Sequence, residues 1–228
     1  MSALAWNVFK SVLAIQAVAA LYRPFEWCLQ QCSVQFPKLT RNQQTYSVKN
    51  AVKSVVLAAC TPMALFILYE RLCKSQYSHV SWIRMSGQLY AACDIVALAK
   101  MHGRLPFSTT LHHTMVLAFS FVNLMLDYND WQNPWSNLAV VASTSCLSYS
   151  VNYYLSLRKL CTAPEDEDAL RRAARWGLVT YLPTFLFAVG FNVYTVQPTT
   201  THGALFLGLM LPVWYDDCVL LRHLWSWW

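Results

Sequence analysis

Long apolar blocks, separated by short basic or proline-bearing stretches, constrain this chain more than any other feature. The chain has 228 residues, of which 56% are hydrophobic and only 12% are charged. Soluble domains usually carry about 25% charged residues. A helix needs about 20 apolar residues to cross the hydrocarbon of a bilayer, and an open strand there would leave its peptide groups unpaired. The sequence therefore predicts an all-α, polytopic membrane helix bundle.

We expect about seven transmembrane helices, two of which are interrupted by polar residues. The first contains Lys10, and the third contains Arg84 and Asp94. A cleaved signal peptide is an alternative for the first, but Lys10 interrupts its apolar region and no clear small-residue cleavage site follows. The expected spans cover residues 3–22, 48–69, 80–100, 110–127, 135–157, 176–196 and 203–224.

The basic residues test this count independently. If the connections alternate sides, 13 of the 17 Lys and Arg residues fall on one side, Lys53 and Arg104 among them. The loops "DYNDWQNPW" and "TVQPTTTHG" on the other side contain none. The positive-inside rule then predicts an N-terminus outside or in a lumen and a C-terminus in the cytosol or its equivalent. The net charge of +6 suits contact with anionic lipid heads. The basic residues are scattered over three loops without an aromatic platform or a basic arm, so nothing indicates binding to nucleic acid.

Two local stretches organise the chain further. The polar linker "FPKLTRNQQTYS" is expected to separate an N-terminal helix and linker (1–45) from a six-helix membrane domain (46–228). The stretch "APEDEDALRRAARW" predicts a capped amphipathic start to the sixth span. No C-x-x-C pair, histidine–glutamate metal motif, glycine-rich phosphate loop or G-x-S-x-G elbow is present, so we expect no metal and no cofactor.

Ionisable residues inside the spans are the candidate functional groups, because each costs about 2.5–3.5 kcal/mol at the centre of a membrane helix. His112 and His113 open the fourth span, Asp94 lies in the third, and Asp216 and Asp217 lie in the seventh. A purely structural role is the alternative. The histidines would then face water or cap a carbonyl, and an aspartate would pair with a tyrosine hydroxyl or with the arginine that follows it.

Helix geometry limits how these groups can meet. Adjacent helical positions lie about 100° apart, so we expect at most one of His112 and His113 to point squarely into a cavity. A rise of 1.5 Å per residue puts Asp94 and His112 within about 10 Å of the same membrane face. A carboxylate there can raise the basicity of a histidine for general-base work. Asp217 is expected about one helical turn farther from that membrane face than Asp94 and His112.

The segment "GQLYAACDIVALAKMHGRLPFSTTLHHTMVLAF" resembles the TLC family of membrane proteins, which includes the ceramide synthases. Tyr90, Asp94, Pro106, His112 and His113 match the family pattern of a tyrosine–aspartate span, a proline-bearing loop and paired histidines. The resemblance covers roughly residues 46–224. It implies a TLC-like bundle with a lipid-accessible cavity on the basic side.

The next span, "STSCLSYSVNYYLSLRKL", is similar to the family's Ser/Thr-rich span and carries Asn152 before a basic exit. Ceramide synthases add a histidine–aspartate–serine–aspartate segment and a glutamate here, whereas Ala142 stands about where such an acid is expected. The acyl-transfer machinery is therefore incomplete. What remains resembles the shorter family members, whose proposed roles are in lipid composition, transport or sensing.

The resemblance implies binding of membrane lipid, acyl-CoA or a sphingolipid. An enzyme of this kind would be an acyl-CoA-dependent N-acyltransferase in which His112 or His113 is the base and Asp94 orients it. Asn152 or Ser145 would bind the substrate head group, and the remaining substrate-binding candidates are Tyr90 and Asp217. The missing acids argue against activity.

A non-catalytic accessory subunit of a larger membrane protein complex is the alternative, and the aromatic end "HLWSWW" fits it. We expect the endoplasmic reticulum membrane, with the mitochondrial inner membrane or another organelle as alternatives.

Overall fold

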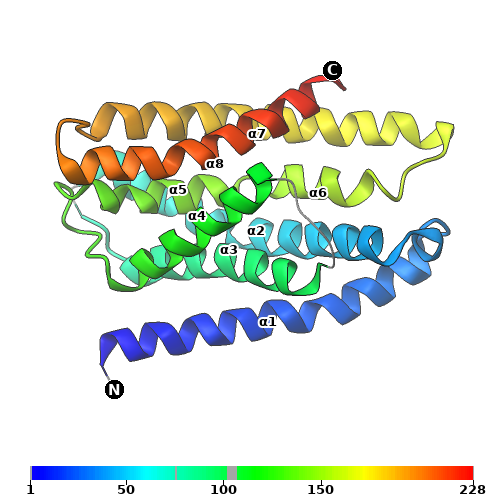
Figure 1. Ribbon diagram of the computed structural model, residues 1–228, viewed down its shortest axis with the longest axis horizontal. Helices are drawn as coiled ribbons and strands as arrows, with labels where there is room; N and C mark the ends of the chain where they lie inside the picture. Colours follow the sequence, from blue (N-terminus) through cyan, green and yellow to red (C-terminus); the bar gives the residue numbers. More distant parts are fainter. Residues whose placement is uncertain (1, 75, 102–106, 228) are drawn as a thin grey trace.

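Helices that run roughly along one axis build the described structure (Figure 1). The computed structural model describes residues 2–74, 76–101 and 107–227, and it contains no strand in those ranges. Pro106 and Arg104 lie outside the described residues. The predicted all-α bundle is confirmed. Its helices are α1 (Ala3–Cys32), α2 (Arg41–Cys73), α3 (Val80–Lys100), α4 (Phe107–Met125), α5 (Leu138–Cys146), α6 (Tyr149–Leu157), α7 (Glu167–Thr195) and α8 (Thr201–Trp225).

Four of these helices are long and apolar enough to cross a membrane: α1, α2, α7 with the turn before it, and α8. They indicate an integral membrane protein. All seven predicted spans fall on helical segments, but α3 and α4 contain buried polar residues that lower their hydropathy. Helices α5 and α6 have nine residues each, about 14 Å apiece at 1.5 Å per residue. The count of seven transmembrane helices stays a prediction.

The expected span at 135–157 is not one helix, so that prediction was wrong in detail. Helix α5 ends at Cys146, and the amides of Leu147 and Ser148 bond back three residues, each at 3.1 Å, to Thr144 and Ser145. The Ser148 hydroxyl also donates to the Ser145 carbonyl at 2.7 Å. Hydroxyls that bond to nearby carbonyls compete with the helical pattern and bend the chain. The Ser/Thr-rich sequence therefore breaks the span into α5 and α6.

The polar linker is shorter than the sequence predicted. Helix α1 continues through Pro24 to Cys32, and α2 already begins at Arg41. Thr40 and Gln43 form a capping box, in which each side chain accepts a hydrogen bond from the other residue's backbone amide. This reciprocal cap fixes the start of α2 before the apolar stretch begins.

The amphipathic start of the sixth span is confirmed. A short 3₁₀ turn, η3 (Pro164–Asp166), leads into α7, whose first residues are Glu167 and Asp168. Arg171 donates to Glu167 one turn earlier at 2.8 Å, and both side chains are about half exposed. The acidic residues lie at the positive end of the helix dipole, as expected for a helix start.

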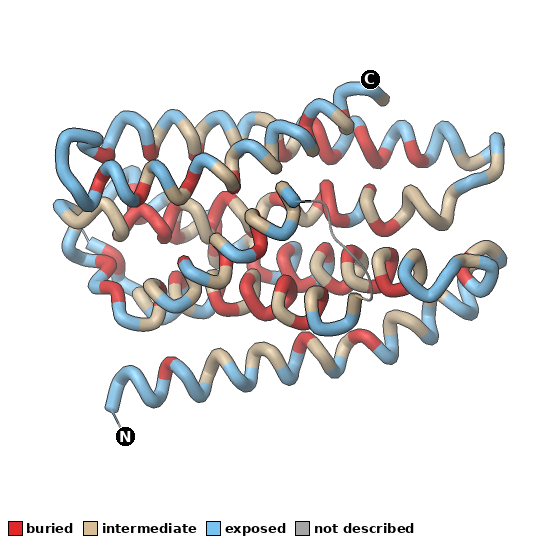
Figure 2. Tube along the Cα trace, viewed as in Figure 1, coloured by how far each residue is buried: buried red, intermediate tan, exposed pale blue. Residues whose placement is uncertain are grey.

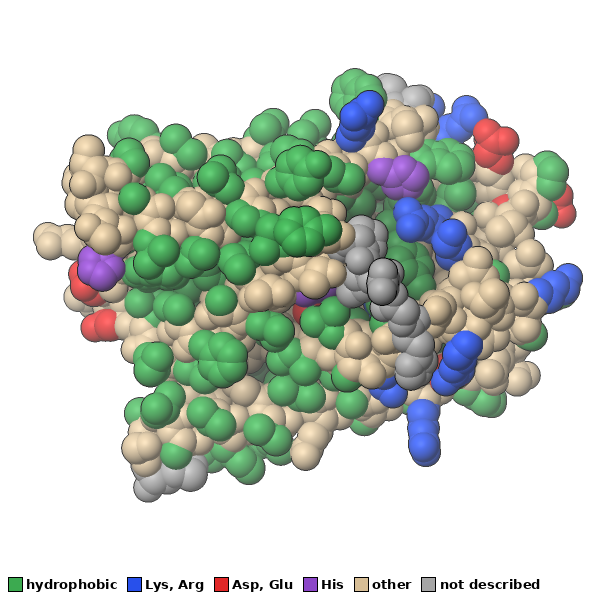
Figure 3. Space-filling view, viewed as in Figure 1, with side chains coloured by type: hydrophobic (Ala, Val, Ile, Leu, Met, Phe, Trp, Pro, Cys, Tyr) green, Lys and Arg blue, Asp and Glu red, His purple; other side chains and the backbone are tan. Residues whose placement is uncertain are grey.

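The buried residues lie along the centre of the bundle (Figure 2). Helix α1 is mostly exposed and packs onto α2 and α3 through Val18 and Tyr22, which contact a core that includes Val52 and Val96. The α1–α2 and α6–α7 connections lie at one end of the bundle, and the α4–α5 and α7–α8 connections lie at the other (Figure 1). We call the end with the α1–α2 and α6–α7 connections the basic end, because Lys and Arg side chains gather there on the face shown in Figure 3.

Candidate functional site

A cavity of about 510 Å³ lies among α2, α3, α4, α6, α7 and α8, and we call it the chamber. Its wall mixes polar and apolar side chains, and three basic and three acidic residues contribute to it. With neutral histidines the formal charge of this wall is therefore zero. The charged residues are Lys49, Lys53, Arg158, Asp94, Asp216 and Asp217.

Asp94 is the most deeply buried acid of the chamber, with 1% of its surface exposed. Its Oδ1 accepts a hydrogen bond of 2.5 Å from Lys53 Nζ, which comes from α2. The same ammonium group lies 4.0 Å from the centre of the Tyr90 ring. Lys53 is therefore the counter-charge of Asp94 and makes a cation–π contact as well. A buried pair of this kind is tolerated only where both charges are well partnered.

The structure brings Asp94 and the paired histidines together. His113 Nδ1 lies 3.2 Å from Asp94 Oδ2, and His112 Nδ1 lies 3.6 Å from Asp216 Oδ2. Both histidines line the chamber, although we expected at most one of them to point squarely into a cavity. The rings are nearly perpendicular at 84°, and they lean toward opposite walls, α3 and α8. The chamber is wide enough for two adjacent histidine rings to line it while they lean in different directions.

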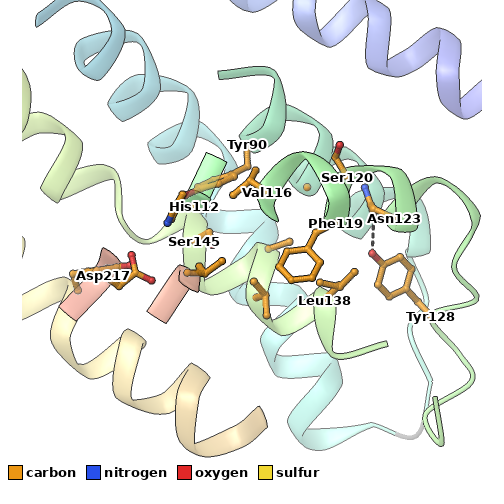
Figure 4. Close-up of a pocket in the computed structure, with 15 residues that line it drawn as sticks. Tyr90, His112, Val116, Phe119, Ser120, Asn123, Tyr128, Leu138, Ser145 and Asp217 are labelled. Atoms are coloured by element: carbon orange, nitrogen blue, oxygen red, sulfur yellow. Dashed lines mark hydrogen bonds between the residues drawn. The ribbon is translucent and has the colours of Figure 1, made fainter. Parts of the chain in front are cut away.

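A narrow pocket of about 70 Å³ meets the chamber and extends between α3, α4, α5 and α8. The two cavities share Tyr90, His112, Tyr181 and Asp217. In Figure 4 the polar side chains of His112 and Asp217 lie at one end of this pocket, and Phe119 lies farther in. Its other apolar walls are Val116, Leu138, Val141, Ala142 and Val213. A polar chamber thus leads into an apolar extension.

The far end of the narrow pocket is closed by Tyr128, whose hydroxyl donates to Asn123 Oδ1 (Figure 4). Asn123 Nδ2 in turn donates to the Arg84 carbonyl at 3.1 Å. A Cβ atom on Gly87 would lie 3.0 Å from Asn123 Nδ2, so the glycine leaves room for this bridge between α3 and α4. Burial raises the pKa of Tyr128, which lies beyond the end of α4, so its hydroxyl remains a protonated donor.

The other predicted substrate-binding residues divide between the two cavities. Asn152 lines the chamber, and its amide donates to the Ser148 carbonyl at 2.9 Å. Ser145 lines the narrow pocket and not the chamber, so its position favours contact with an acyl chain over contact with a lipid head group. Asp217 and Tyr181 line both cavities, which is consistent with the alternative that an aspartate of this pair contacts a tyrosine.

Sequence reasoning missed the basic residues of the chamber. Lys53 was counted with the first loop, although its position one turn after Lys49 in an apolar stretch is a signal that both face one side of a helix. Lys49 Nζ and Arg158 Cζ lie 5.2 and 5.0 Å from the centre of the same Tyr46 ring. Arg158 Nη1 is also 3.3 Å from His223 Nε2. These residues form a basic rim on the chamber.

Three of the predicted residues could hold a metal ion. Asp94, His112 and His113 each offer a ligand atom, and these atoms lie within 4.8 Å of one another. Sequence spacing gave no sign of this, because the aspartate comes from α3 and the histidines come from adjacent positions of α4.

Comparisons with known proteins identify no relative: no protein-family model, curated protein or solved structure matches the chain.

Proposed function

We propose that this integral membrane protein is of TLC type and binds one amphipathic lipid, with the head group in the chamber and a short part of the acyl chain in the narrow pocket. The observation that carries this proposal is the change from a charged wall to an apolar wall across four shared residues. Ligand sites of this volume class are typically concave and apolar, with a few polar groups that fix orientation.

The charge pattern favours a head group that is zwitterionic or neutral. Lys53 is already paired with Asp94, so it contributes little net charge to a ligand. The remaining basic residues, Lys49 and Arg158, form the rim, while Asp216 and Asp217 lie on α8. Opposite charges on separate walls are complementary to a head group that carries both signs. A sphingolipid or glycerophospholipid of this kind fits better than a polyanion.

The head group would decide which lipid binds. Moving an acyl chain from water to an apolar pocket is worth about 0.8 kcal/mol per methylene. A lipid that enters from the bilayer is already out of water, however, and lipid tails are as apolar as the pocket walls. The gain from chain burial is then small. Selectivity must therefore arise from the polar contacts in the chamber and from the shape of the narrow pocket.

Acyl transfer is the catalytic form of this proposal. His113, held beside Asp94, would take the proton of an amine or hydroxyl that attacks the thioester carbonyl of an acyl-CoA. The carbon–sulfur bond would break, and the CoA thiolate would leave and take up that proton. Ala142, which stands where the resemblance leads us to expect an acid, lies on the apolar pocket. That placement supports lipid binding without catalysis. We further propose seven spans in the endoplasmic reticulum membrane, with the basic end toward the cytosol.

A photoreactive lipid tests the proposal. The full chain in mild detergent is incubated with a phosphatidylcholine that carries a diazirine on its acyl chain, irradiated, and digested for mass spectrometry. We expect labelled peptides from α4 and α5. Ala142→Phe should fill the narrow pocket and reduce this labelling at least about tenfold, equivalent to about 1.4 kcal/mol.

Ala59→Phe is the matched control, because Ala59 is an exposed alanine of α2 outside both cavities. It should leave the labelling unchanged. Equal labelling of α4 and α5 in both variants would contradict the proposal. If the chain migrates only as part of a large stable complex and its cavities take up no label, the accessory-subunit alternative is favoured.

A further inference from the structure

We propose that Asp94, His112 and His113 bind a divalent first-row transition-metal ion of the zinc or iron(II) class at the wall of the chamber. The ligand atoms would be Asp94 Oδ2, His112 Nδ1 and His113 Nδ1. This inference is independent of the lipid, because it depends on the side chains of α3 and α4 alone.

The three ligand atoms share one unusual property. Each is buried and has no hydrogen-bond partner among the described residues. The residues that carry them are almost inaccessible: Asp94 is 1% exposed, His112 7% and His113 8%. A buried polar atom without a partner costs about 1–3 kcal/mol. Three residues that carry such atoms, grouped so that their ligand atoms lie within 4.8 Å of one another, point to a partner that is not a protein side chain.

The contact between His113 and Asp94 has the dimensions of a metal site. Their Nδ1 and Oδ2 atoms are 3.2 Å apart, yet the direction of the ring N–H does not give a hydrogen bond. In a hydrogen bond the proton lies on the line between the two atoms. In a metal site both lone pairs point instead to a third position. Ligands about 2.0–2.2 Å from one ion, at tetrahedral or octahedral angles, lie about 2.9–3.5 Å from each other.

His112 completes the set from the opposite direction. One of its ring nitrogens is within 4.8 Å of the ligand atoms of the other two residues. Its Nδ1 also lies 3.6 Å from Asp216 Oδ2, which offers a fourth ligand atom from α8. Two histidines and one carboxylate with open positions are the ligand set of non-haem iron(II) sites and of catalytic zinc sites.

Lys53 limits how tightly the ion binds. Its ammonium group contacts Asp94 Oδ1 and leaves Oδ2 for the metal, but two positive charges on one carboxylate repel each other. We therefore expect weaker binding than in a structural zinc site. Lys53→Met should remove the repulsion and tighten binding, because the ion then becomes the counter-charge of Asp94.

The open positions of the ion would face the chamber, since all three ligand residues line it. An ion there could bind an oxygen atom of a ligand and withdraw electron density from it. The site would thus bind a divalent cation, and the cation would in turn bind a carbonyl, phosphoryl or water oxygen.

Metal titration tests the site directly. The full chain is purified in detergent without a polyhistidine tag and stripped with EDTA. Cys28→Ser and Cys32→Ser form the background, because these exposed thiols lie 3.9 Å apart and would bind metal themselves. Zn²⁺ is titrated against a chromophoric chelator, and Co²⁺ supplies a visible spectrum. We expect one ion per chain and a Co²⁺ spectrum typical of nitrogen and oxygen ligands.

Two variants distinguish metal binding at this site from metal binding elsewhere on the chain. His113→Gln should weaken binding at least about 100-fold, because it removes a ligand outright and even outer-shell changes cost 10- to 100-fold. It keeps the pair of Asp94 and Lys53, so the fold is retained and the thermal unfolding midpoint can verify this. His223→Gln is the matched control, a histidine of the same chamber outside the cluster, and should bind normally. Unchanged binding in His113→Gln, or a stoichiometry well below one, would overturn the proposal.

Discussion

Two buried charged clusters lie at different levels of α2, one at Lys53 and one at Arg71 near the end of the helix, and they differ in what surrounds the charge. The first surrounds Asp94, which pairs with Lys53 and lies on a chamber of about 510 Å³. The second surrounds Arg71, which is 9% exposed and donates to Asn137 Oδ1 at 2.8 Å. Neither Arg71 nor Asn137 lines the chamber or the narrow pocket.

Rings and amides enclose the Arg71 cluster. The guanidinium carbon lies 4.1 Å from the centre of the Trp131 ring, and Asn137 Nδ2 donates to Thr195 at 2.7 Å. Burial raises the pKa of Tyr77, in the loop after α2, although the nearby Arg71 acts in the opposite direction. The phenol therefore remains neutral. This cluster joins α2, the 3₁₀ turn before α5 and α7, and its hydrogen bonds are made to neutral protein groups, so we assign it a structural role.

The difference shows that burial of a charge does not by itself mark a functional site. Both clusters would be singled out by hydropathy, because each puts ionisable groups among apolar helices. Both clusters contain buried atoms without a hydrogen-bond partner in the described part of the chain, such as Arg71 Nη1 in one and His113 Nδ1 in the other. The Asp94 cluster differs by its adjoining cavity and by the type of these atoms, which are a carboxylate oxygen and imidazole nitrogens that can bind a metal ion. Stability measurements should separate the two, since one cluster depends on a pair of opposite charges and the other on neutral partners.

The largest effect is expected from Asp94→Ala. It leaves the Lys53 ammonium group buried without its counter-charge, which typically costs 3–5 kcal/mol. Reversible unfolding in mixed detergent micelles measures this loss. Lys53→Met combined with Asp94→Leu should recover most of it, because no charge is then left alone. A single mutant as stable as the original chain would show that the pair has little structural importance.

Arg71→Met should have an intermediate effect. It removes a charged hydrogen bond to Asn137 and a cation–π contact with Trp131, together worth about 2–3 kcal/mol, while the methionine keeps part of the packing. The same unfolding measurement applies. Labelling by the photoreactive lipid should be unchanged, and a loss of labelling at equal stability would contradict the structural assignment.

Glu167→Gln should have the smallest effect. Its pair with Arg171 lies on the surface of α7, with side chains 56% and 44% exposed, so solvent screens the attraction. Exposed helical pairs of this spacing contribute about 0.5 kcal/mol or less. A change in unfolding free energy comparable with that of Asp94→Ala would show that burial is not what distinguishes the two ion pairs.

Much of the candidate site could be predicted from the sequence. Asp94, His112 and His113 stand out because they interrupt apolar spans, and the short connection between their helices predicts that they are neighbours. Lys53 could not be assigned in the same way. It lies near the start of a span, where a lysine normally reaches to the interface, and only the packing of α2 on α3 turns it toward Asp94.

The sequence by itself determined the class of protein and the approximate positions of its helices. Hydropathy and capping are local properties, so they can be read from neighbouring residues, as Thr40 and Gln43 illustrate at the start of α2. The tertiary structure alone decided which polar groups meet. Contacts such as that of His112 with Asp216 depend on the rotation of each helix about its axis and on the break after Cys146. Those quantities arise from the packing of all the helices together, and no single segment specifies them.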